Sequence, residues 1–322
     1  MRIHKVEFVD LYIGADFSDI TGINGKPGRS PVPPPLLGDV EELRRQCESK
    51  YERYGEEEFS LNVEGTMFRV TVMEDLTETI TFVLRKSAAS IRPAASLPLA
   101  PSILEFLLAA DLRGLVLVAG EIATGKTSTA STLFAERLAL HGGVAVAVED
   151  PNETALHGVR GKGRCIQLWA SEKRGGYQEQ LKKALRSGAN LLLVGEIRDE
   201  RTALEVGRAA INGFTCISTI HADTPVHAVS RFHSLCAGQT NRAADLIADG
   251  LSMVIWQTIR RRASEERNAT RLETKVLRVA GMNSVVAKIR DAKFSMLEQD
   301  VIDQANKIAF DQQSLKMLGT KK

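Results

Sequence analysis

A glycine-framed segment between Val118 and Thr129 (VAGEIATGKTST) carries the residue types of a phosphate-binding loop. It has the spacing of the template G-x-x-x-x-G-K-[ST], whose fixed positions are here Gly120, Gly125, Lys126 and Thr127. An apolar run precedes the loop and a helical pattern follows it, which is the strand, loop and helix context that the template needs. Backbone N–H groups and the positive end of the helix dipole then face the phosphates. The segment therefore predicts a site for a nucleoside triphosphate.

The bound species expected at this loop are ATP and Mg²⁺. The lysine would reach the β- and γ-phosphates, and Thr127 would bind the metal. The residues expected to contact the nucleotide are Gly120, Ala123, Thr124, Gly125, Lys126, Thr127 and Ser128. Glu121 is an acid inside the same loop, so its side chain is expected to point away from the phosphates. The alternative is a strand, turn and helix that match the template by chance.

A first acidic segment follows the apolar run VAVAVED and reads Val148-Glu-Asp-Pro-Asn-Glu153. It places Glu149 and Asp150 beside the nucleotide if this strand neighbours the first. A carboxylate there would orient or deprotonate the attacking water. Taken alone, an acid before a proline is more often a turn or helix-capping residue, and this alternative stays open.

A second acid, Glu196, stands at the end of the run LLLVGE. At that position it would bind Mg²⁺ directly or through water. The neighbouring Arg198 and Asp199 either belong to the site or form an ordinary surface ion pair.

A histidine ends the fourth apolar run, in Ser218-Thr-Ile-His-Ala222. A lone histidine at a strand end is usually structural. His221 follows polar residues at the ends of the other apolar runs, so we interpret it as a contact to the γ-phosphate or a catalytic helper. The other histidines are interpreted as solvent-facing or packing residues.

The elements that must position these groups are strands alternating with helices. The apolar runs LVLVAG, VAVAVED, LLLVGE and TCISTIH are separated by helical segments, among them residues 179–186. This pattern predicts a parallel sheet covered on both faces, with ligands at the strand ends. From about Ala243 the chain is expected to be mostly helical, with strands near Val254 and Thr274.

Residues 1–90 predict a separate α+β module. Gly22 to Pro35 is too rich in glycine and proline for regular structure, and Asp39 is expected to cap a helix that runs to about Tyr54. The runs FSLNVEG, MFRVTVM and TITFVLRK predict a meander. Residues 87–101, with several prolines, are expected to link this domain to a second one at 91–322.

Composition narrows the class of protein. The chain has 322 residues, of which 43% are hydrophobic and 25% charged, as in ordinary two-domain globular proteins. The net charge is only +2, and no basic run is interleaved with aromatics, so direct nucleic-acid binding is not expected. The cysteines form no C-x-x-C pair, so neither a zinc site nor a disulfide framework is predicted. No signal peptide or membrane span is expected.

Together the four segments resemble the signatures of the hexameric secretion ATPases of type II secretion, type IV pili and type IV secretion. GEIATGKTS resembles their Walker A loop, VEDPNE the Asp box, LLLVGEIRDE the Walker B segment and STIHAD the His box. Residues 17–20, 23–26 and 68–70 resemble parts of the family's N-terminal domain, and residues 285–293 resemble a helix of its retraction branch. The resemblance thus covers nearly the whole chain.

This resemblance implies a RecA-like P-loop ATPase domain with a parallel sheet, preceded by a small PAS-like α+β domain. It implies that Glu149 is the general base, that Glu196 organises Mg²⁺ and that His221 contacts the γ-phosphate, although the two acids could exchange roles. It also implies that Arg69 and Arg85 complete a nucleotide site at an interface, as arginine fingers do. Alternatively these two arginines only face solvent.

The resemblance further implies a homo-hexamer in the cytoplasm, peripheral to the inner membrane through a platform or secretion-complex protein. The four-cysteine insert of the export branch is absent from the sequence, which favours PilT-like retraction ATPases or DotB- and TraJ-like transfer ATPases. Two other functions stay open. One is a DNA-handling RecA-like motor, for which Arg260-Arg-Arg262 is the one basic cluster. The other is an ATP-gated docking subunit with little turnover.

Overall fold

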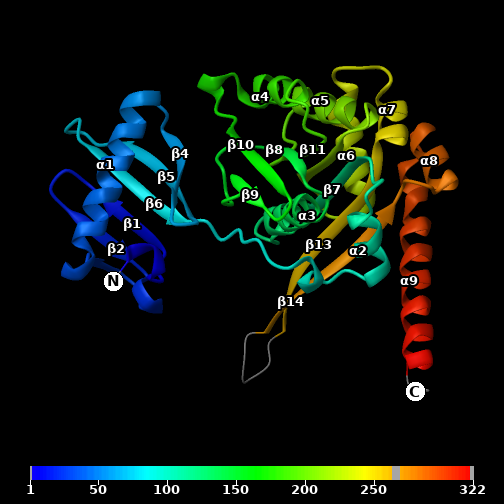
Figure 1. Ribbon diagram of the computed structural model, residues 1–322, viewed down its shortest axis with the longest axis horizontal. Helices are drawn as coiled ribbons and strands as arrows, with labels where there is room; N and C mark the ends of the chain where they lie inside the picture. Colours follow the sequence, from blue (N-terminus) through cyan, green and yellow to red (C-terminus); the bar gives the residue numbers. More distant parts are fainter. Residues whose placement is uncertain (1, 263–268, 320–322) are drawn as a thin grey trace. The chain divides into compact units, whose positions relative to one another are not determined.

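The computed structural model describes residues 2–262 and 269–319, which form two compact units (Figure 1). The first unit comprises Met1–Ser90 together with Glu149–Ala155 and Trp169–Gly176, and the second comprises Ile91–Val148, Leu156–Leu168 and Tyr177–Lys322. The break after Ser90 lies inside the linker that the prolines predict. The two later segments of the first unit were not expected there.

The first unit is an antiparallel sheet with one long helix. The strand order is β3-β2-β1-β6-β5-β4, and α1 spans Leu37–Tyr54. The strands are β1 (Asp10–Ile13), β2 (Ser18–Thr21), β3 (Arg29–Pro31), β4 (Glu58–Val63), β5 (Thr66–Glu74) and β6 (Ile80–Lys86). The predicted meander is present as β4, β5 and β6, paired antiparallel in that order.

The core of this unit lies between α1 and the sheet. Val40, Leu43 and Cys47 recur at helical spacing and are buried on one side of α1. They belong to one cluster with alternate residues of the strands, such as Phe68 and Val70 of β5. An amphipathic helix on an alternating sheet is the arrangement that the α+β prediction describes.

Side chains hold the two later segments in this unit. The hydroxyl of Ser60 donates to the Asn152 carbonyl at 2.6 Å, and the Ser171 hydroxyl donates to Glu56 Oε1 at 2.5 Å. The Trp169 ring meets the Tyr54 ring edge-on, with centroids 5.7 Å apart.

Two expectations for the N-terminal region are wrong. The segment from Gly22 to Pro35 is not without regular structure, because β3 pairs with β2 and short 3₁₀ helices flank it at Ile23–Gly25 and Pro34–Leu36. Asp39 does not cap α1, because the 3₁₀ turn leads into the helix two residues earlier and the N-cap is Leu36. The Asp39 carboxylate instead accepts the backbone N–H of Ile3 at 2.6 Å.

The second unit is built on a long mixed sheet of order β14-β13-β7-β12-β11-β8-β10-β9. Its strands are β7 (Gly114–Gly120), β8 (Gly143–Glu149), β9 (Gly158–Arg160), β10 (Gly163–Trp169), β11 (Leu191–Val194), β12 (Thr215–His221), β13 (Leu251–Arg262) and β14 (Ala269–Arg278). Its helices are α2 (Pro101–Leu108), α3 (Lys126–His141), α4 (Gly176–Leu185), α5 (Glu200–Ile211), α6 (Pro225–Ala237), α7 (Ala243–Gly250), α8 (Asn283–Arg290) and α9 (Leu297–Gly319). Further 3₁₀ turns lie at Ala94–Ser96 and Phe294–Met296 in this unit and at Ile3–Lys5 and Glu172–Arg174 in the first unit.

The four predicted apolar strands are β7, β8, β11 and β12. They pair in parallel as β7 with β12, β12 with β11 and β11 with β8. The strands expected near Val254 and Thr274 are β13 and β14, an antiparallel pair that joins this sheet because β13 runs parallel to β7. The carboxyl ends of the parallel strands therefore share one edge.

Helices cover both faces of this sheet (Figure 1). Val116 and Val118 of β7 share a core cluster with Phe134 of α3 and Leu107 of α2. The alternate strand residues point to the other face, where α5, α6 and α7 pack on one another and against β7. Among the described helices, none is both long and apolar enough to cross a membrane.

Candidate nucleotide-binding site

The loop after β7 has the backbone of a tight phosphate cradle. Gly120 and Gly125 have φ values of 154° and 83°, which side chains rarely permit, and Ala123 has a φ of 60°. A Cβ on Gly120 would lie 2.3 Å from the Gln257 carbonyl oxygen. Helix α3 then begins at Lys126, so its N-terminal N–H groups stand directly behind the loop.

The loop is closed by its own hydrogen bonds. The Glu121 carbonyl accepts the Thr124 hydroxyl at 2.9 Å and the Lys126 ammonium at 2.6 Å. The Glu121 side chain is exposed. An exposed position is compatible with the predicted orientation away from the phosphates, and that orientation stays a prediction. Thr127, expected on Mg²⁺, and Ser128 follow Lys126 in the first turn of α3.

A chain of polar contacts joins the loop to the ends of two other strands. Lys126 Nζ lies 3.3 Å from Nδ1 of His221, and Nε2 of His221 lies 3.3 Å from Oε1 of Glu196. Arg198 approaches the other carboxylate oxygen of Glu196 at 2.8 Å. The parallel pairing explains this meeting, because His221 is the register partner of Gly120 on β7.

The contacts assign the protonation of this chain. An ammonium only donates, so Nδ1 of His221 accepts and Nε2 carries the proton that points to Glu196. Burial lowers the pKa of His221 below its ordinary value of 6.5, and the Lys126 charge lowers it further, whereas Glu196 raises it. The imidazole is therefore neutral at pH 7.

Arg198 and Asp199, the charged residues that follow in the predicted motif, have different roles: the first contacts the site and the second caps a helix. Arg198 pairs with Glu196. Asp199 is the N-cap of α5, where its carboxylate accepts the N–H of Thr202 at 2.9 Å and the hydroxyl of Thr202 at 2.7 Å.

Glu149 is the last residue of β8 and is 2% exposed. The Asn152 amide lies 3.5 Å from the Glu149 carboxylate, and the backbone carbonyl of Glu149 accepts the N–H of Ala170 at 2.9 Å. Trp169 Nε1 donates to the neighbouring Asp150 at 3.1 Å. These contacts all lie within the first unit, so its relation to the loop remains an expectation from strand order.

Arg69 and Arg85 are register partners on β5 and β6 and are both exposed. The Arg69 guanidinium donates to the Glu58 carboxylate at 2.6 Å, and the Arg85 guanidinium donates two hydrogen bonds to the Asp10 carboxylate at 2.6 and 2.8 Å. Hydrogen bonding to Asp10 raises the pKa of Arg85 above its usual value. Each arginine is thus paired with an acid, and the role of the two arginines at a nucleotide remains a prediction.

Strand β13 contributes residues that the sequence analysis did not select. Gln257 is fully buried, and its Nε2 donates to the carbonyl of Thr124 in the loop at 2.5 Å. Trp256 Nε1 donates to the carbonyl of Ala222, next to His221, at 3.1 Å. The one signal in the sequence was a glutamine inside the apolar run MVIWQTI.

The residues present fit a nucleotide with Mg²⁺. A Cβ on Gly120 would clash with the Gln257 carbonyl oxygen, and the φ of 83° at Gly125 disfavours a side chain there, so both positions suit a loop whose backbone N–H groups bind phosphate. The Thr127 hydroxyl and the Glu196 carboxylate are hard oxygen ligands, and Mg²⁺ normally takes few protein ligands and keeps waters and phosphate oxygens. Among residues 2–262 and 269–319, no group of three or more His, Cys, Asp or Glu side chains forms a separate metal cluster.

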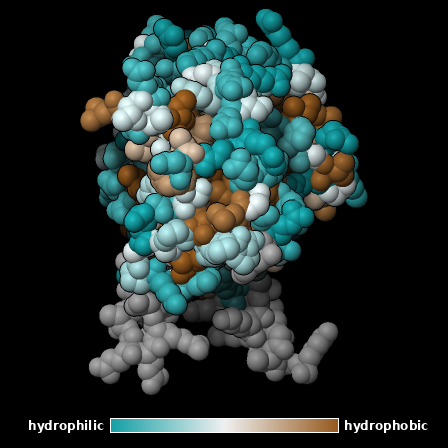
Figure 2. Space-filling model, turned by 90° about the vertical axis from the view of Figure 1, so that its left-hand side faces the viewer, coloured by the Kyte–Doolittle hydropathy of each residue, from teal (hydrophilic) through white to brown (hydrophobic). Residues whose placement is uncertain are grey.

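Hydrophilic residues cover most of the face in Figure 2, and hydrophobic ones occupy smaller areas. Exposed apolar side chains are ordinary on protein surfaces. In the basic cluster at 260–262, Arg260 pairs with Glu273 at 2.8 Å, and the other two side chains lie outside the described residues.

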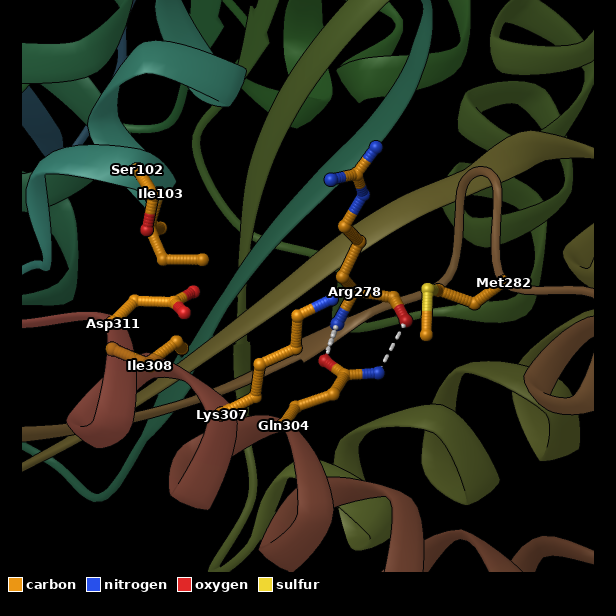
Figure 3. Close-up of a pocket in the computed structure, with 8 residues that line it drawn as sticks. All are labelled: Ser102, Ile103, Arg278, Met282, Gln304, Lys307, Ile308 and Asp311. Carbon is orange, nitrogen blue, oxygen red and sulfur yellow. Dashed lines mark hydrogen bonds between the residues drawn. The ribbon is translucent and has the colours of Figure 1, made fainter. Parts of the chain in front are cut away.

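A cavity of about 240 Å³ lies between α2, β14 and α9 (Figure 3). Gln304 spans its floor, where the amide accepts the Arg278 N–H at 2.7 Å and donates to the Arg278 carbonyl at 3.0 Å. The Arg278 guanidinium stacks on the ring of Phe106. The cavity shares no lining residue with the loop after β7.

Residues 65–317 match the family described as "Type II/IV secretion system protein". The chain is 28% identical over 233 residues to the type IV pilus ATPase PilU of Pseudomonas aeruginosa, covering 69% of this chain and 58% of PilU. It is 38% identical over 111 residues to the competence protein ComGA of Streptococcus pneumoniae, covering 34% of this chain and 33% of ComGA. The chain thus spans less than two thirds of these relatives.

Two solved structures share the fold. The structure of the pilus retraction motor PilT with bound ADP superposes with a TM-score of 0.74 at 21% identity, covering 93% of this chain and 89% of that one. The ATPase DotB of Legionella pneumophila superposes with a TM-score of 0.70 at 16% identity, covering 91% and 84%. The predicted fold class, a parallel-sheet P-loop domain after a small α+β domain, is confirmed.

Proposed function

Since the chain belongs to the Type II/IV secretion system protein family, we propose that it is a Mg²⁺-dependent ATPase that converts ATP and water to ADP and phosphate. The observation that carries this proposal is the contact chain from Lys126 in the loop through His221 to Glu196. A lysine, a neutral histidine and a carboxylate at one sheet edge supply a cation for phosphates, a hydrogen-bonding ring and a metal ligand.

In this proposal the loop amides and Lys126 bind the phosphates, and Thr127 with Glu196 holds Mg²⁺. Bound Mg²⁺ would neutralise charge on the phosphate oxygens. His221 lies between Lys126 and Glu196. Once Lys126 engages the nucleotide and Glu196 holds Mg²⁺, the neutral imidazole would take its other tautomer and donate from Nδ1 to a γ-phosphate oxygen, because phosphate oxygens only accept hydrogen bonds. Glu149 orients and deprotonates the attacking water. Glu149 and Glu196 could exchange these two roles.

We further propose that Arg69 and Arg85 complete the site at an interface and that the active form is a ring hexamer. In this arrangement residues 1–90 act as a PAS-like domain that swings against the ATPase domain at 91–322 about the proline-rich segment 87–101. Support comes from the family membership and from the separate compactness of the two units. The hexamer is expected to act on the cytoplasmic side of the inner membrane, bound to a platform or secretion-complex protein. There it would drive pilus retraction, or type IV secretion and conjugative transfer.

The test is steady-state phosphate release with ATP and Mg²⁺. Lys126→Ala is expected to remove most activity, because the ammonium that meets the phosphates is lost. Lys182→Ala is the matched control, since Lys182 is an exposed lysine on α4 paired with Glu179. Activity of Lys126→Ala equal to that of the unmodified protein would refute the proposed function.

Assembly is tested separately by light scattering after size-exclusion chromatography, with and without a non-hydrolysable ATP analogue. A ring predicts a mass near six chains in at least one condition, and a single-chain mass in both would refute it. The DNA-handling motor predicts hydrolysis that rises with added DNA. The docking subunit predicts nucleotide binding with negligible turnover.

A further inference from the structure

Gln257 is a fully buried polar side chain of β13 that reaches the loop after β7. Its Nε2 donates to the carbonyl of Thr124 at 2.5 Å. A carbonyl oxygen only accepts, so this contact also assigns the amide: its nitrogen faces the loop and its oxygen faces away. β13 is held there by its parallel pairing with β7, in which Trp256 is the register partner of Ala119.

The contact controls one peptide plane of the loop. The carbonyl of Thr124 and the N–H of Gly125 belong to the same trans peptide, so they point in opposite directions. Because Gln257 draws the carbonyl toward β13, the N–H of Gly125 is turned to the opposite side. In loops of this template the backbone N–H groups are the phosphate ligands.

The backbone of β13 approaches the other end of the loop as well. A Cβ on Gly120 would lie 2.3 Å from the Gln257 carbonyl oxygen, and a Cβ on Gly125 would lie 3.5 Å from its Nε2. Gln257 therefore lies next to both template glycines, with its backbone carbonyl near Gly120 and its side-chain amide near Gly125. The loop is consequently supported from a strand that is distant in the sequence, in addition to its own internal bonds.

Stability alone does not account for this side chain. Among the described residues, none donates a hydrogen bond to Oε1 of Gln257, although the atom is buried. A buried acceptor without a donor is unfavourable for folding, which offsets the gain from the bond to Thr124. An apolar side chain of the same shape would serve the core about as well.

We propose that Gln257 is a positioning residue that orients the Gly125 N–H toward a phosphate of a nucleoside di- or triphosphate before the nucleotide binds. The proposal rests on the nucleotide site of the proposed function and assigns to it a residue of β13. A preset amide binds phosphate more tightly than one that must reorient, because the ordering cost is removed.

The test is ADP binding with Mg²⁺, measured by calorimetry on the full chain. Gln257→Met keeps the side-chain volume and removes the donor. Binding is expected to weaken about tenfold, the ordinary effect of one hydrogen bond, with the Tm of the nucleotide-free protein nearly unchanged. The amide acts on substrate and transition state alike, so KM for ATP should rise while kcat stays near its original value.

Gln304→Met is the matched control, because Gln304 also holds backbone groups, those of Arg278, away from the loop (Figure 3). It is expected to lower the Tm and to leave ADP binding unchanged. Gln257→Glu is a second variant, which keeps the size of the side chain. Because the position is fully buried, the carboxyl stays neutral and its O–H can donate to the Thr124 carbonyl, so ADP is expected to bind more tightly than to Gln257→Met.

The outcomes separate the two proposals. If the unmodified protein does not bind ADP, the proposed function and this inference both fail. If it binds ADP and both Gln257 variants bind equally well, only the inference is wrong. If Gln257→Met and Gln304→Met lower the Tm equally and both weaken ADP binding, the loss of affinity follows from the loss of stability. Gln257 would then have a purely structural role, and the inference would be wrong.

Discussion

Lys126, at the start of α3, and His221, at the end of β12, touch through Nζ and Nδ1 at 3.3 Å. In the proposed site the histidine then links the phosphate-binding lysine to Glu196. His221 thus contacts both of the other groups. Loss of its imidazole is therefore expected to affect hydrolysis more than nucleotide binding.

His221→Ala is expected to lower the rate of ATP hydrolysis on the order of a hundredfold, the usual effect of losing one polar group that stabilises a transition state. ADP affinity should change little, because the loop and Lys126 remain. Phosphate release and calorimetry measure the two quantities. His227→Ala is the control, because it removes a half-exposed imidazole of α6 that is paired with Asp223. Equal rates in both variants would contradict a role for His221.

The two acids are expected to differ in their response to Mg²⁺. Glu149→Gln should bind ATP and Mg²⁺ normally and hydrolyse slowly at any Mg²⁺ concentration, because only the base is lost. Glu196→Gln should need more Mg²⁺ for half-maximal activity, because a ligand is weakened. Hydrolysis rates over a Mg²⁺ titration distinguish them. The reverse pattern would mean that the acids have exchanged roles.

Arg85→Ala is expected to reduce hydrolysis on the order of a hundredfold if the arginine acts on nucleotide at an interface. Arg29→Ala is a close control, since Arg29 pairs with Asp19 on the same sheet and its side chain is 67% exposed against 66% for Arg85. Each arginine pairs with a largely buried carboxylate, so the Tm should fall by a similar amount in the two proteins. Equal activity of the two variants would place Arg85 outside the site.

Gly120→Ala is expected to destabilise the fold by about 1–3 kcal/mol, because the new Cβ would meet the Gln257 carbonyl oxygen and the φ of 154° is unfavourable. Gly38→Ala is the control, since a Cβ there meets nothing within 4 Å and the residue lies in α1. That change should raise stability by about 0.5–1 kcal/mol. Urea unfolding measures both, and similar effects would contradict the tight approach of β13 to the loop.

The thiols are expected to be unreactive in the folded protein. Burial raises the pKa of Cys47, Cys216 and Cys236 to about 12 in each case, and Cys165 is buried as well. A raised pKa means that the reactive thiolate is scarce at pH 8. Titration with a thiol reagent at pH 8 should detect little signal before denaturant is added and all four thiols afterwards. Rapid reaction of the native protein would show that these cysteines are accessible.

Local patterns predicted the parts of this protein that depend on neighbouring residues in the chain. The loop at Gly120 to Lys126 needs a strand, two glycines and a helix start, all of which are contiguous. β11, which leads to Glu196, and β12, which ends at His221, were recognisable as apolar runs, and parallel pairing then brings their ends to one edge. Backbone geometry and the burial of an apolar run depend on a few consecutive residues, so they can be predicted from the local sequence.

Other features depend on contacts between distant segments. β13 was expected only as a strand near Val254, and its place beside β7 brings Gln257 to a carbonyl that lies 133 positions earlier in the chain. Asp39 accepts the N–H of Ile3 instead of capping its helix, and Asn152 is tied to Ser60 in the first unit. Such partners are chosen by packing in three dimensions. A short polar side chain can satisfy many donors and acceptors equally well, so its sequence neighbourhood does not reveal which one it meets.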